Sequence, residues 1–432
     1  MILAEKFSQK LNNLKSRQEI KDYFVFFDES RKLSLRTEEG GIGKHTFPTH
    51  YSEFSIGKYI IIWNDDKVSK GQVTNTSISG FDEFINNAKK TALTQKDEIY
   101  IPERGIYPMV RVFSKSLADM IDVPEYILKL ADILDELDKM IKNTKGHAEL
   151  EIKEGTRYAY SSRNLDEYYP YTEFNVIKTF KNNFSWKLSS ADIYSIYKFQ
   201  ELFSFLGDIY NLLNSAKSVK LKSGSYNVIL APHIFQNLFI DQIVNSLDGD
   251  NILKRKSPFT INDFTDRKKV FGSMSLCYDP LINLKNGTYS FTSYGYKPQR
   301  QYFIKFGKLD TPILNGLNYS QLGYKSPTIE IMDFGNIKLE GLKKRTYEEN
   351  KKLADSFIYV PDIVKRHMKS KQKDAILTSK SLFYENENPK STSKFSFNLD
   401  LAHELKNGNV ELVEFIDGQI GAKIANLPVK FS

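Results

Sequence analysis

The spacing of hydrophobic and polar positions predicts a chain built from both helices and strands. Asp122 and Pro124 are expected in the first turn of the third predicted helix (residues 122–141), because an acidic cap and an early proline both favour a helix start. Ser79 is the expected N-cap of the second predicted helix (residues 81–93). Ser189 or Ser190 is the expected N-cap of the fourth (residues 191–216). Apolar residues recurring every three or four positions predict helices at 2–16, 81–93, 122–141, 191–216, 232–247 and 348–356.

Runs rich in β-branched and aromatic residues, bounded by turn residues, predict strands over much of the remaining chain. The 25 tyrosines and 30 phenylalanines agree with a strand-rich protein. The sequence therefore predicts an α+β fold in which helices pack on long, mainly antiparallel sheets. The predicted strands are 23–27, 33–36, 59–63, 71–76, 109–114, 147–153, 156–161, 171–180, 184–187, 228–230, 271–276, 290–292, 301–306, 328–332, 375–377 and 394–397.

The length of 432 residues exceeds what one small core accommodates. A polar stretch with proline and glycine, residues 94–108, separates an N-terminal unit of helix, strands and helix from the rest. We predict three segments, an N-terminal α/β unit at 1–95, a middle α+β domain at 96–222 and a β-rich C-terminal domain at 223–432.

Composition narrows the class of protein. The net charge of +8 is spread along the chain, largely on lysines interleaved with acidic residues, which favours a solvated surface over a nucleic-acid footprint. No segment reaches the roughly 20 apolar residues needed to span a bilayer, and the N-terminus has no apolar signal core. One cysteine, Cys277, allows no intramolecular disulfide and fits a reducing cytoplasm.

Catalytic motifs are scarce. The six histidines are scattered without HxH or HxxxH spacing, and His403-Glu404 does not continue into HExxH. There is no Gly-x-Ser-x-Gly elbow and no glycine-rich phosphate loop. Cys277 lies in an apolar, strand-like context, where a buried and inert thiol is the default interpretation. The residues alone therefore indicate a multi-domain protein without a recognisable catalytic set.

The most informative stretch is residues 226–250, a short apolar strand that leads into an amphipathic helix ending in Leu-Asp-Gly-Asp. This stretch resembles the TldD/TldE (PmbA) family, whose TldD members carry HExxxH followed by Gly-Leu-Glu-Gly-Asp. Looser similarity covers GKYIIIWNDDKVSKGQVTNT at 57–76, the segment 293–328, and the closing segments 355–363 and 394–414. The resemblance implies a PmbA/TldD-like multi-domain architecture.

When the motif is aligned on residues 247–250, its first His, its Glu and its second His fall on Ile240, Asp241 and Asn245. A hydrocarbon and a neutral amide thus replace both imidazoles, and zinc depends on such ligands. The resemblance therefore implies a degenerate motif and no metal or cofactor on this chain. Histidines five apart are rotated by about 140° on a regular helix, so the motif implies a helix end or a widened turn at 240–245.

The resemblance also implies partners. In the family, zinc-bearing TldD members associate with TldE members that lack zinc, and the complex encloses a cavity for unfolded peptides. We therefore expect a TldE-like subunit that pairs with a zinc-bearing TldD-like chain or with itself and binds unfolded peptide, with no nucleic acid and no membrane as partner. Candidate peptide or partner contacts are His233, Asp248, Asp250 and Gly295.

Two alternatives belong to other functional classes. The chain could be an active peptidase or amidase with a relocated site that uses residues such as His233 and Asp250. It could also be a binding or scaffold protein that acts alone as a homodimer. Hydrolysis blocked by a chelator would favour the first alternative, whereas copurification with an HExxxH-bearing chain would count against the second.

Overall fold

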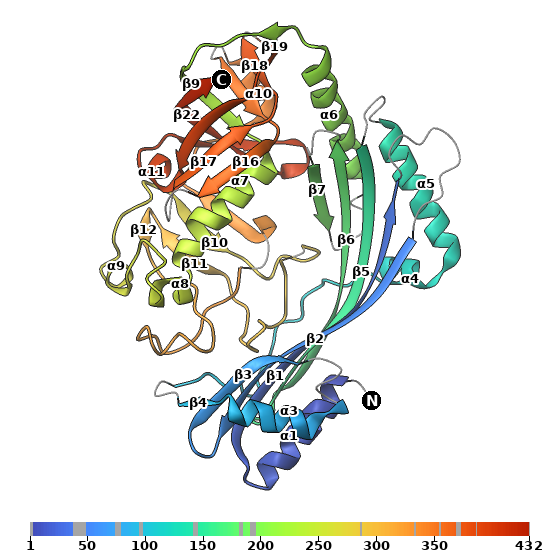
Figure 1. Cartoon of the computed structure of the whole chain (residues 1–432), viewed down its shortest axis with the longest axis vertical. Coiled ribbons are helices and arrows are strands. Elements are labelled where there is room, and N and C mark those ends of the chain that lie inside the picture. The colour runs from blue at the N-terminus through green and yellow to red at the C-terminus, as the bar shows by residue number, and fades with distance from the viewer. Residues whose placement is uncertain are drawn as a thin grey trace.

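The structure, a computed structural model, has the mixed architecture that the sequence predicts (Figure 1). It describes residues 3–37, 49–73, 79–94, 98–140, 146–180, 185–190, 196–285, 287–331, 334–353, 356–368, 373–385 and 387–431. Helices pack on extensive, mainly antiparallel sheets, which confirms the α+β prediction. None of the helices described is both long and apolar enough to cross a membrane.

A long antiparallel sheet dominates the N-terminal half. β1 lies at its centre and pairs with β2 on one side and β5 on the other. The sheet therefore crosses the predicted boundary at residue 95, and the division into three segments stays a prediction. In order, the strands are β4 (Leu93–Thr94), β3 (Lys67–Val73), β2 (Thr49–Trp63), β1 (Ile20–Arg36), β5 (Gly146–Ser161), β6 (Asp166–Phe180) and β7 (Ser185–Ser190).

Side-chain alternation along β1 divides the apolar residues between two cores. Tyr23, Val25 and Phe27 pack with helices α1 (Leu3–Ser16) and α3 (Phe81–Lys90). Phe24 and Phe26 belong instead to the large core shared with the C-terminal half. The same strand thus contributes to both faces of the sheet.

Helices also cover the other end of this sheet. α4 (Lys115–Asp122) and α5 (Pro124–Met140) pack against β5, and α6 (Ile196–Ser215) packs against α5 and strands β18 and β19 of the C-terminal half. Figure 1 shows the long strands running from the end covered by α1 and α3 to the end beside α4 and α5. α6 therefore links the two halves of the molecule.

The C-terminal half contains two sheets. In the larger sheet the strand order is β16 (Ile363–Met368), β17 (Lys373–Thr378), β20 (Phe395–Asp400), β22 (Ile420–Phe431), β9 (Gly224–Leu230), β15 (Phe357–Val360), β18 (Ser381–Glu385), β19 (Asn388–Thr392) and β8 (Ser218–Val219). In addition, β21 (Val410–Glu414) pairs with both β22 and β14 (Lys344–Thr346). In the smaller sheet the strand order is β12 (Lys308–Leu309), β11 (Gln301–Lys305), β10 (Ser275–Tyr278) and β13 (Ile337–Glu340). Short helices lie between the strands, namely α7 (Pro232–Phe239), α8 (Gly249–Leu253), α9 (Ile261–Thr265), α10 (Tyr347–Lys352) and α11 (Leu401–Lys406).

Three predicted strands are wrong. Residues 109–114, 290–292 and 328–331 are not in strands, because their backbone groups bond to irregular partners. In the first, the Val112 carbonyl accepts from β6 and the Arg111 carbonyl accepts from Leu284. Such a segment, bonded alternately to two different neighbours, cannot form a ladder.

Two predicted helix caps are also wrong. Asp122 ends α4 rather than starting the next helix, which begins at Pro124. Gly80, not Ser79, is the N-cap of α3. The cap predicted at Ser189 or Ser190 stays a prediction, because both residues end β7 and residues 191–195, which lead to α6, lie outside the described residues. Local propensity thus located these helices but not all of their ends.

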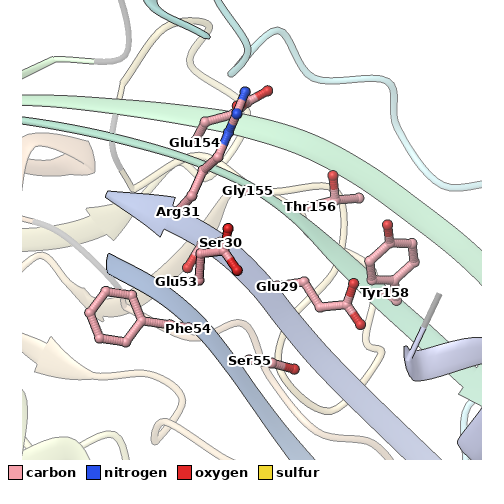
Figure 2. Close-up of a pocket in the computed structure, with 10 residues that line it drawn as sticks. All are labelled: Glu29, Ser30, Arg31, Glu53, Phe54, Ser55, Glu154, Gly155, Thr156 and Tyr158. Carbon is pink, nitrogen blue, oxygen red and sulfur yellow. The ribbon is translucent and has the colours of Figure 1, made fainter. Parts of the chain in front are cut away.

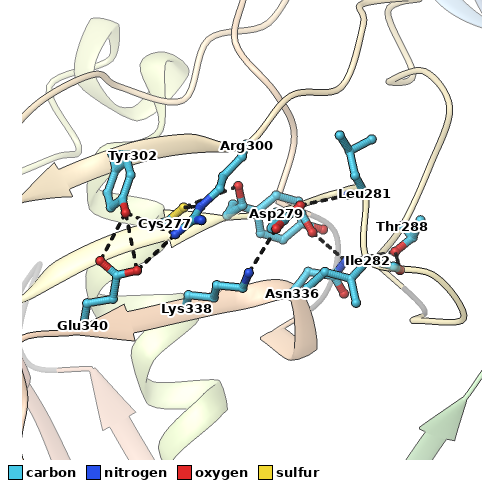
Figure 3. Close-up of polar contacts among 11 residues, drawn as sticks. Cys277, Asp279, Leu281, Ile282, Thr288, Arg300, Tyr302, Asn336, Lys338 and Glu340 are labelled. Carbon is cyan, nitrogen blue, oxygen red and sulfur yellow. Dashed lines mark hydrogen bonds and ion pairs between the residues drawn. The ribbon is translucent and has the colours of Figure 1, made fainter. Parts of the chain in front are cut away.

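The small sheet encloses the single cysteine (Figure 3). Cys277 on β10 is fully buried, as the sequence predicted. Arg300 donates from Nε to its sulfur at 3.2 Å and from Nη2 to Glu340 Oε1 at 3.1 Å. Next to it, Lys338 pairs with Asp279 at 3.0 Å. Charged side chains therefore cover this face of the sheet.

We expect Phe7→Ala to destabilise the end of the long sheet that α1 covers. Phe7 is fully buried and makes edge-on ring contacts with Phe27, Phe81 and Phe84. The cavity should cost about 3–5 kcal/mol, measured as faster hydrogen exchange in α1 and α3. Lys6→Ala, on the exposed side of the same turn, is the control, and equal effects from both variants would contradict the expectation.

Candidate functional site

The element at residues 224–253 starts as a buried strand and continues as a helix of changing pitch. β9 ends at Leu230, and Pro232 opens α7 at a position where a helix needs no N–H donor. Ile234, Phe235 and Leu238 bury one face of α7. A π-helical turn, Ile240–Val244, follows, then a 3₁₀ turn, Asn245–Leu247.

The π-helical turn confirms the widened turn predicted for 240–245. The amide of Asn245 donates to the carbonyl of Ile240, five residues back, instead of four as in an α-helix. The structure therefore retains the backbone geometry that the aligned motif requires. This hydrogen bond involves only main-chain atoms, so it does not depend on histidine side chains.

The side chains at the motif positions have other partners. Ile240 is half-buried and packs against the large core. Asn245 is exposed, and its Nδ2 lies 3.5 Å from Asp241 Oδ1. Asp241 Oδ2 accepts from Arg366 Nη1 at 2.5 Å, across from β16. The motif acid is thus engaged within the chain.

A buried ionic network stands behind Asp241. Arg366 donates from Nε and Nη2 to Asp374 Oδ2 at 3.0 and 2.7 Å. Gln242 Nε2 donates to the same oxygen at 2.8 Å. Burial lowers the pKa of Arg366, but its hydrogen bonds to Asp374 and Asp241 outweigh that effect, so the net shift is upward. The guanidinium is therefore charged at any physiological pH.

This set of donors does not fit a zinc ion of the kind that HExxxH would hold. Zinc favours several imidazole, thiolate or carboxylate ligands around one point. Here the hydrocarbon of Ile240 cannot ligate, Asn245 offers an amide, and a guanidinium lies against Asp241. Within the described ranges, no group of three or more His, Cys, Asp or Glu side chains could hold a metal ion.

Asp248 caps a helix, and Asp250 binds the loop at 313–318. Asp248 caps α8 by accepting from the Asn251 amide at 2.9 Å, and burial is the main cause that raises its pKa. Asp250 accepts from Asn318 Nδ2 at 2.8 Å. Gly249 between them donates to the Ile313 carbonyl at 2.8 Å. Both acids therefore have structural partners, and their role as peptide contacts stays a prediction.

The segment before Gly295 lies close to these acids. Glu330 accepts from the Ser293 amide and hydroxyl at 2.7 and 2.6 Å, and Lys58 of β2 donates to the Ser293 hydroxyl at 3.0 Å. Burial, followed by the charges of Glu330, Asp250 and Asp248, raises the pKa of Tyr294 to about 12. A cluster of mixed charge thus joins the N-terminal sheet to the end of the motif helix.

Gly295 lies where the two halves of the chain meet. Its φ is +68°, a region that favours glycine, and its carbonyl accepts from the Tyr107 hydroxyl at 2.8 Å. A Cβ at this position would lie 2.6 Å from Pro102 and 2.8 Å from Phe24. Close packing therefore explains the glycine, and its role as a peptide or partner contact stays a prediction.

His233 lies in the first turn of α7. Its side chain is partly exposed by area, but both ring nitrogens are buried. Burial lowers its pKa to about 4, so the imidazole is neutral at pH 7. Its predicted role as a contact residue is likewise untested.

A cavity of about 490 Å³ lies elsewhere, on the long sheet (Figure 2). Glu29, Arg31, Glu53 and Glu154 contribute charged groups to its wall. Arg31 pairs with Glu154 and with Asp122 at the end of α4, and the Asp122 bond is the main cause that raises its pKa. Composition had not indicated this cavity, because its charges come from strands far apart in sequence.

Sequence reasoning missed three residues of the network at the motif. Arg366 and Asp374 lie more than a hundred residues after Asp241, and no spacing rule connects them. Gln242 reads as an ordinary helix residue, although it is buried and its Oε1 accepts from the Leu401 amide at 2.8 Å. The pairing of β16 with β17 brings Arg366 and Asp374 together, and the π-helical turn adds Gln242 to them.

Comparison with known proteins agrees with this architecture. Residues 223–412 match the PmbA/TldA metallopeptidase C-terminal domain. Comparison with curated proteins finds no match.

Solved structures share the fold over the whole chain. A candidate modulator of DNA gyrase from Bacteroides thetaiotaomicron has a TM-score of 0.79 at 12% identity, with 99% of each chain covered. TldE from Thermococcus kodakarensis has a TM-score of 0.77 at 15% identity, covering 98% of this chain and 100% of that one. A candidate modulator of a DNA gyrase from Thermotoga maritima has a TM-score of 0.75 at 13% identity, covering 98% and 99%.

The fold and the matched domain define a metallopeptidase-related α+β protein. Residues 223–412 carry the match to the family's C-terminal domain, and the whole chain shares the fold of the solved structures, in agreement with the resemblance to the TldD/TldE (PmbA) family seen in the sequence.

Gly295→Ala tests the close packing of Gly295 against Pro102 and Phe24, where the two halves of the chain meet. We expect a loss of about 2–4 kcal/mol, because the new methyl group meets Pro102 and Phe24 and the backbone has positive φ. Gly323→Ala is the matched control, since Gly323 has φ +79° and no atom lies within 4 Å of the place that its methyl group would take. Urea unfolding should separate the two variants, and similar midpoints would contradict the packing argument.

His233→Gln tests the buried imidazole. The unfolded chain binds a proton near pH 6.5 that the folded chain binds only near pH 4, so folding stability is lost as pH falls through this window. We expect wild type to lose about 2 kcal/mol more than the variant over that range, after allowance for solvent screening. Urea midpoints at neutral pH and about pH 5 measure this difference, and parallel losses in both proteins would refute it.

Proposed function

We propose that this chain is a non-catalytic, TldE-like subunit of a TldD–TldE type metallopeptidase complex that processes unfolded peptides. The observation that carries the proposal is the motif turn, which keeps its π-helical geometry while Ile240 and Asn245 replace the ligands. Similarity in fold to TldE from Thermococcus kodakarensis supports it. In this proposal the zinc belongs only to a TldD-like partner.

The chain would form part of the peptide chamber. β16 lies at the end of the larger sheet and pairs with β17 on one side, so an extended peptide could add to its other edge through main-chain hydrogen bonds. Val364 on this strand is 52% exposed. Because Arg366 of the same strand contacts Asp241, a peptide at this edge would lie beside the motif turn.

Other parts of the proposal concern assembly and location. A homodimer is the alternative assembly, in which a second copy replaces the TldD-like partner. We place the protein in the cytoplasm, a location with which a single cysteine is compatible. No observation in the described part of the chain favours a relocated hydrolytic site over these proposals.

Coexpression with a chain that carries intact HExxxH tests the proposal. We expect the two chains to copurify, zinc to be stoichiometric with the partner, and peptide cleavage to require both chains. The isolated chain should contain no stoichiometric zinc, because its motif lacks both imidazoles.

A partner with both motif histidines replaced by alanine is the matched control, which should still bind this chain but should not cleave peptide. Stoichiometric zinc on the isolated chain, lost in Asp241→Asn, would refute the non-catalytic role. A partner that cleaves peptide fully without this chain would refute its role as a subunit of the active complex.

A further inference from the structure

The family's metal centre and this chain's side chains disagree in a specific way. At the motif position the chain has a carboxylate, Asp241, and behind it a second carboxylate, Asp374. Asp374 is buried, whereas Asp241 is partly exposed, and a carboxylate withdrawn from water requires a compensating positive charge. The structure supplies that charge to Asp374 as the guanidinium of Arg366.

Arg366 contacts both carboxylates at once. Nη1 donates to Asp241, while Nε and Nη2 both donate to Asp374 Oδ2. Asp374 is fully buried, and among the described residues its second oxygen, Oδ1, has no hydrogen-bond partner. The charge of Arg366 is therefore the main compensation for a carboxylate that water does not reach.

The same network fixes the π-helical turn to the sheet. Asp241 and Gln242 are consecutive residues of that turn, and both are tied to Arg366 or Asp374. Gln242 also donates to the Leu399 carbonyl at 3.3 Å and accepts from the Leu401 amide. The turn is thus attached to β16, β17 and the connection from β20 to α11.

We infer that the Arg366 guanidinium engages the acid of the degenerate motif and holds the π-helical turn to the sheet by bridging Asp241 and Asp374. Arg366 is a positioning residue in this arrangement. The inference rests on the proposed non-catalytic role only in requiring that no metal occupies the motif position, and it does not require the complex to form.

The geometry explains why arginine is suited to this role. A guanidinium offers donors in several directions in one plane and can serve two carboxylates simultaneously, whereas an ammonium is a compact point charge. A lysine at 366 would keep the positive charge but lose the planar set of donors that reaches both carboxylates. The two properties can therefore be separated by mutation.

Chemical rescue of Arg366→Ala is the experiment. We expect a Tm lower than wild type by roughly 5 °C, because a buried carboxylate loses its counter-charge. Guanidinium chloride at tens of millimolar should recover about half of that loss, since the ion refills the vacated position. Sodium chloride at equal ionic strength should not, and guanidinium should not raise the Tm of wild type.

Arg366→Ala/Asp374→Asn is the matched control, because it keeps the space but removes the buried charge. Guanidinium should leave its Tm unchanged or lower it. If Arg366→Ala alone does not fold, the double variant and Arg366→Lys remain testable. The lysine variant should have an intermediate Tm, and hydrogen exchange at the Asn245 amide should rise in it.

A Tm of Arg366→Ala within experimental error of wild type would overturn the inference. Equal rescue of the single and double variants would also overturn it. These outcomes are independent of copurification. If the two chains do not copurify but guanidinium rescues Arg366→Ala, the subunit role is rejected and the guanidinium bridge is kept. If the chains copurify but guanidinium does not rescue the variant, the bridge alone is rejected.

Discussion

The alternation of side chains along β1 is the constraint on which the rest of the structure depends. β1 is the central strand and pairs along its two edges with β2 and β5, while apolar side chains on both of its faces are buried. Tyr23 and Phe27 are committed to the core beneath α1 and α3, and Phe24 and Phe26 to the opposite core. A one-residue slip would exchange both sets and separate the two halves.

The position of the C-terminal half follows from the second of these faces. Phe26 meets Phe291 edge to face, and Phe24 lies where any side chain at 295 would have to fit. Lys58 on the neighbouring strand contacts Ser293, and Glu330 in turn holds Ser293. The N-terminal sheet thus positions the loop that lies beside Asp248 and Asp250, at the end of the helix that carries residues 240–245.

Sequence reasoning succeeded where the deciding interactions are local and failed where they are not. The helix at 232–247 was predictable because its apolar periodicity is local, and the widened turn was one of the two outcomes that the resemblance to the family motif implied. The strand at 109–114 was not, because its backbone groups bond to Thr172 and Leu284, which no local pattern reveals. Arg366 was missed for the same reason, since its partner Asp241 is 125 residues away.

The motif region shows that backbone geometry and ligand chemistry can separate. The π-helical hydrogen bond from Asn245 to Ile240 uses only main-chain atoms, so loss of ligand side chains leaves it possible. Charge balance is different, because a buried carboxylate such as Asp374 demands a counter-charge whatever the ancestry of the site. The guanidinium of Arg366, on β16, supplies this counter-charge and also holds the π-helical turn to the sheet. The π-helical turn is therefore held both by its own main-chain hydrogen bond and by the ionic bridge through Arg366.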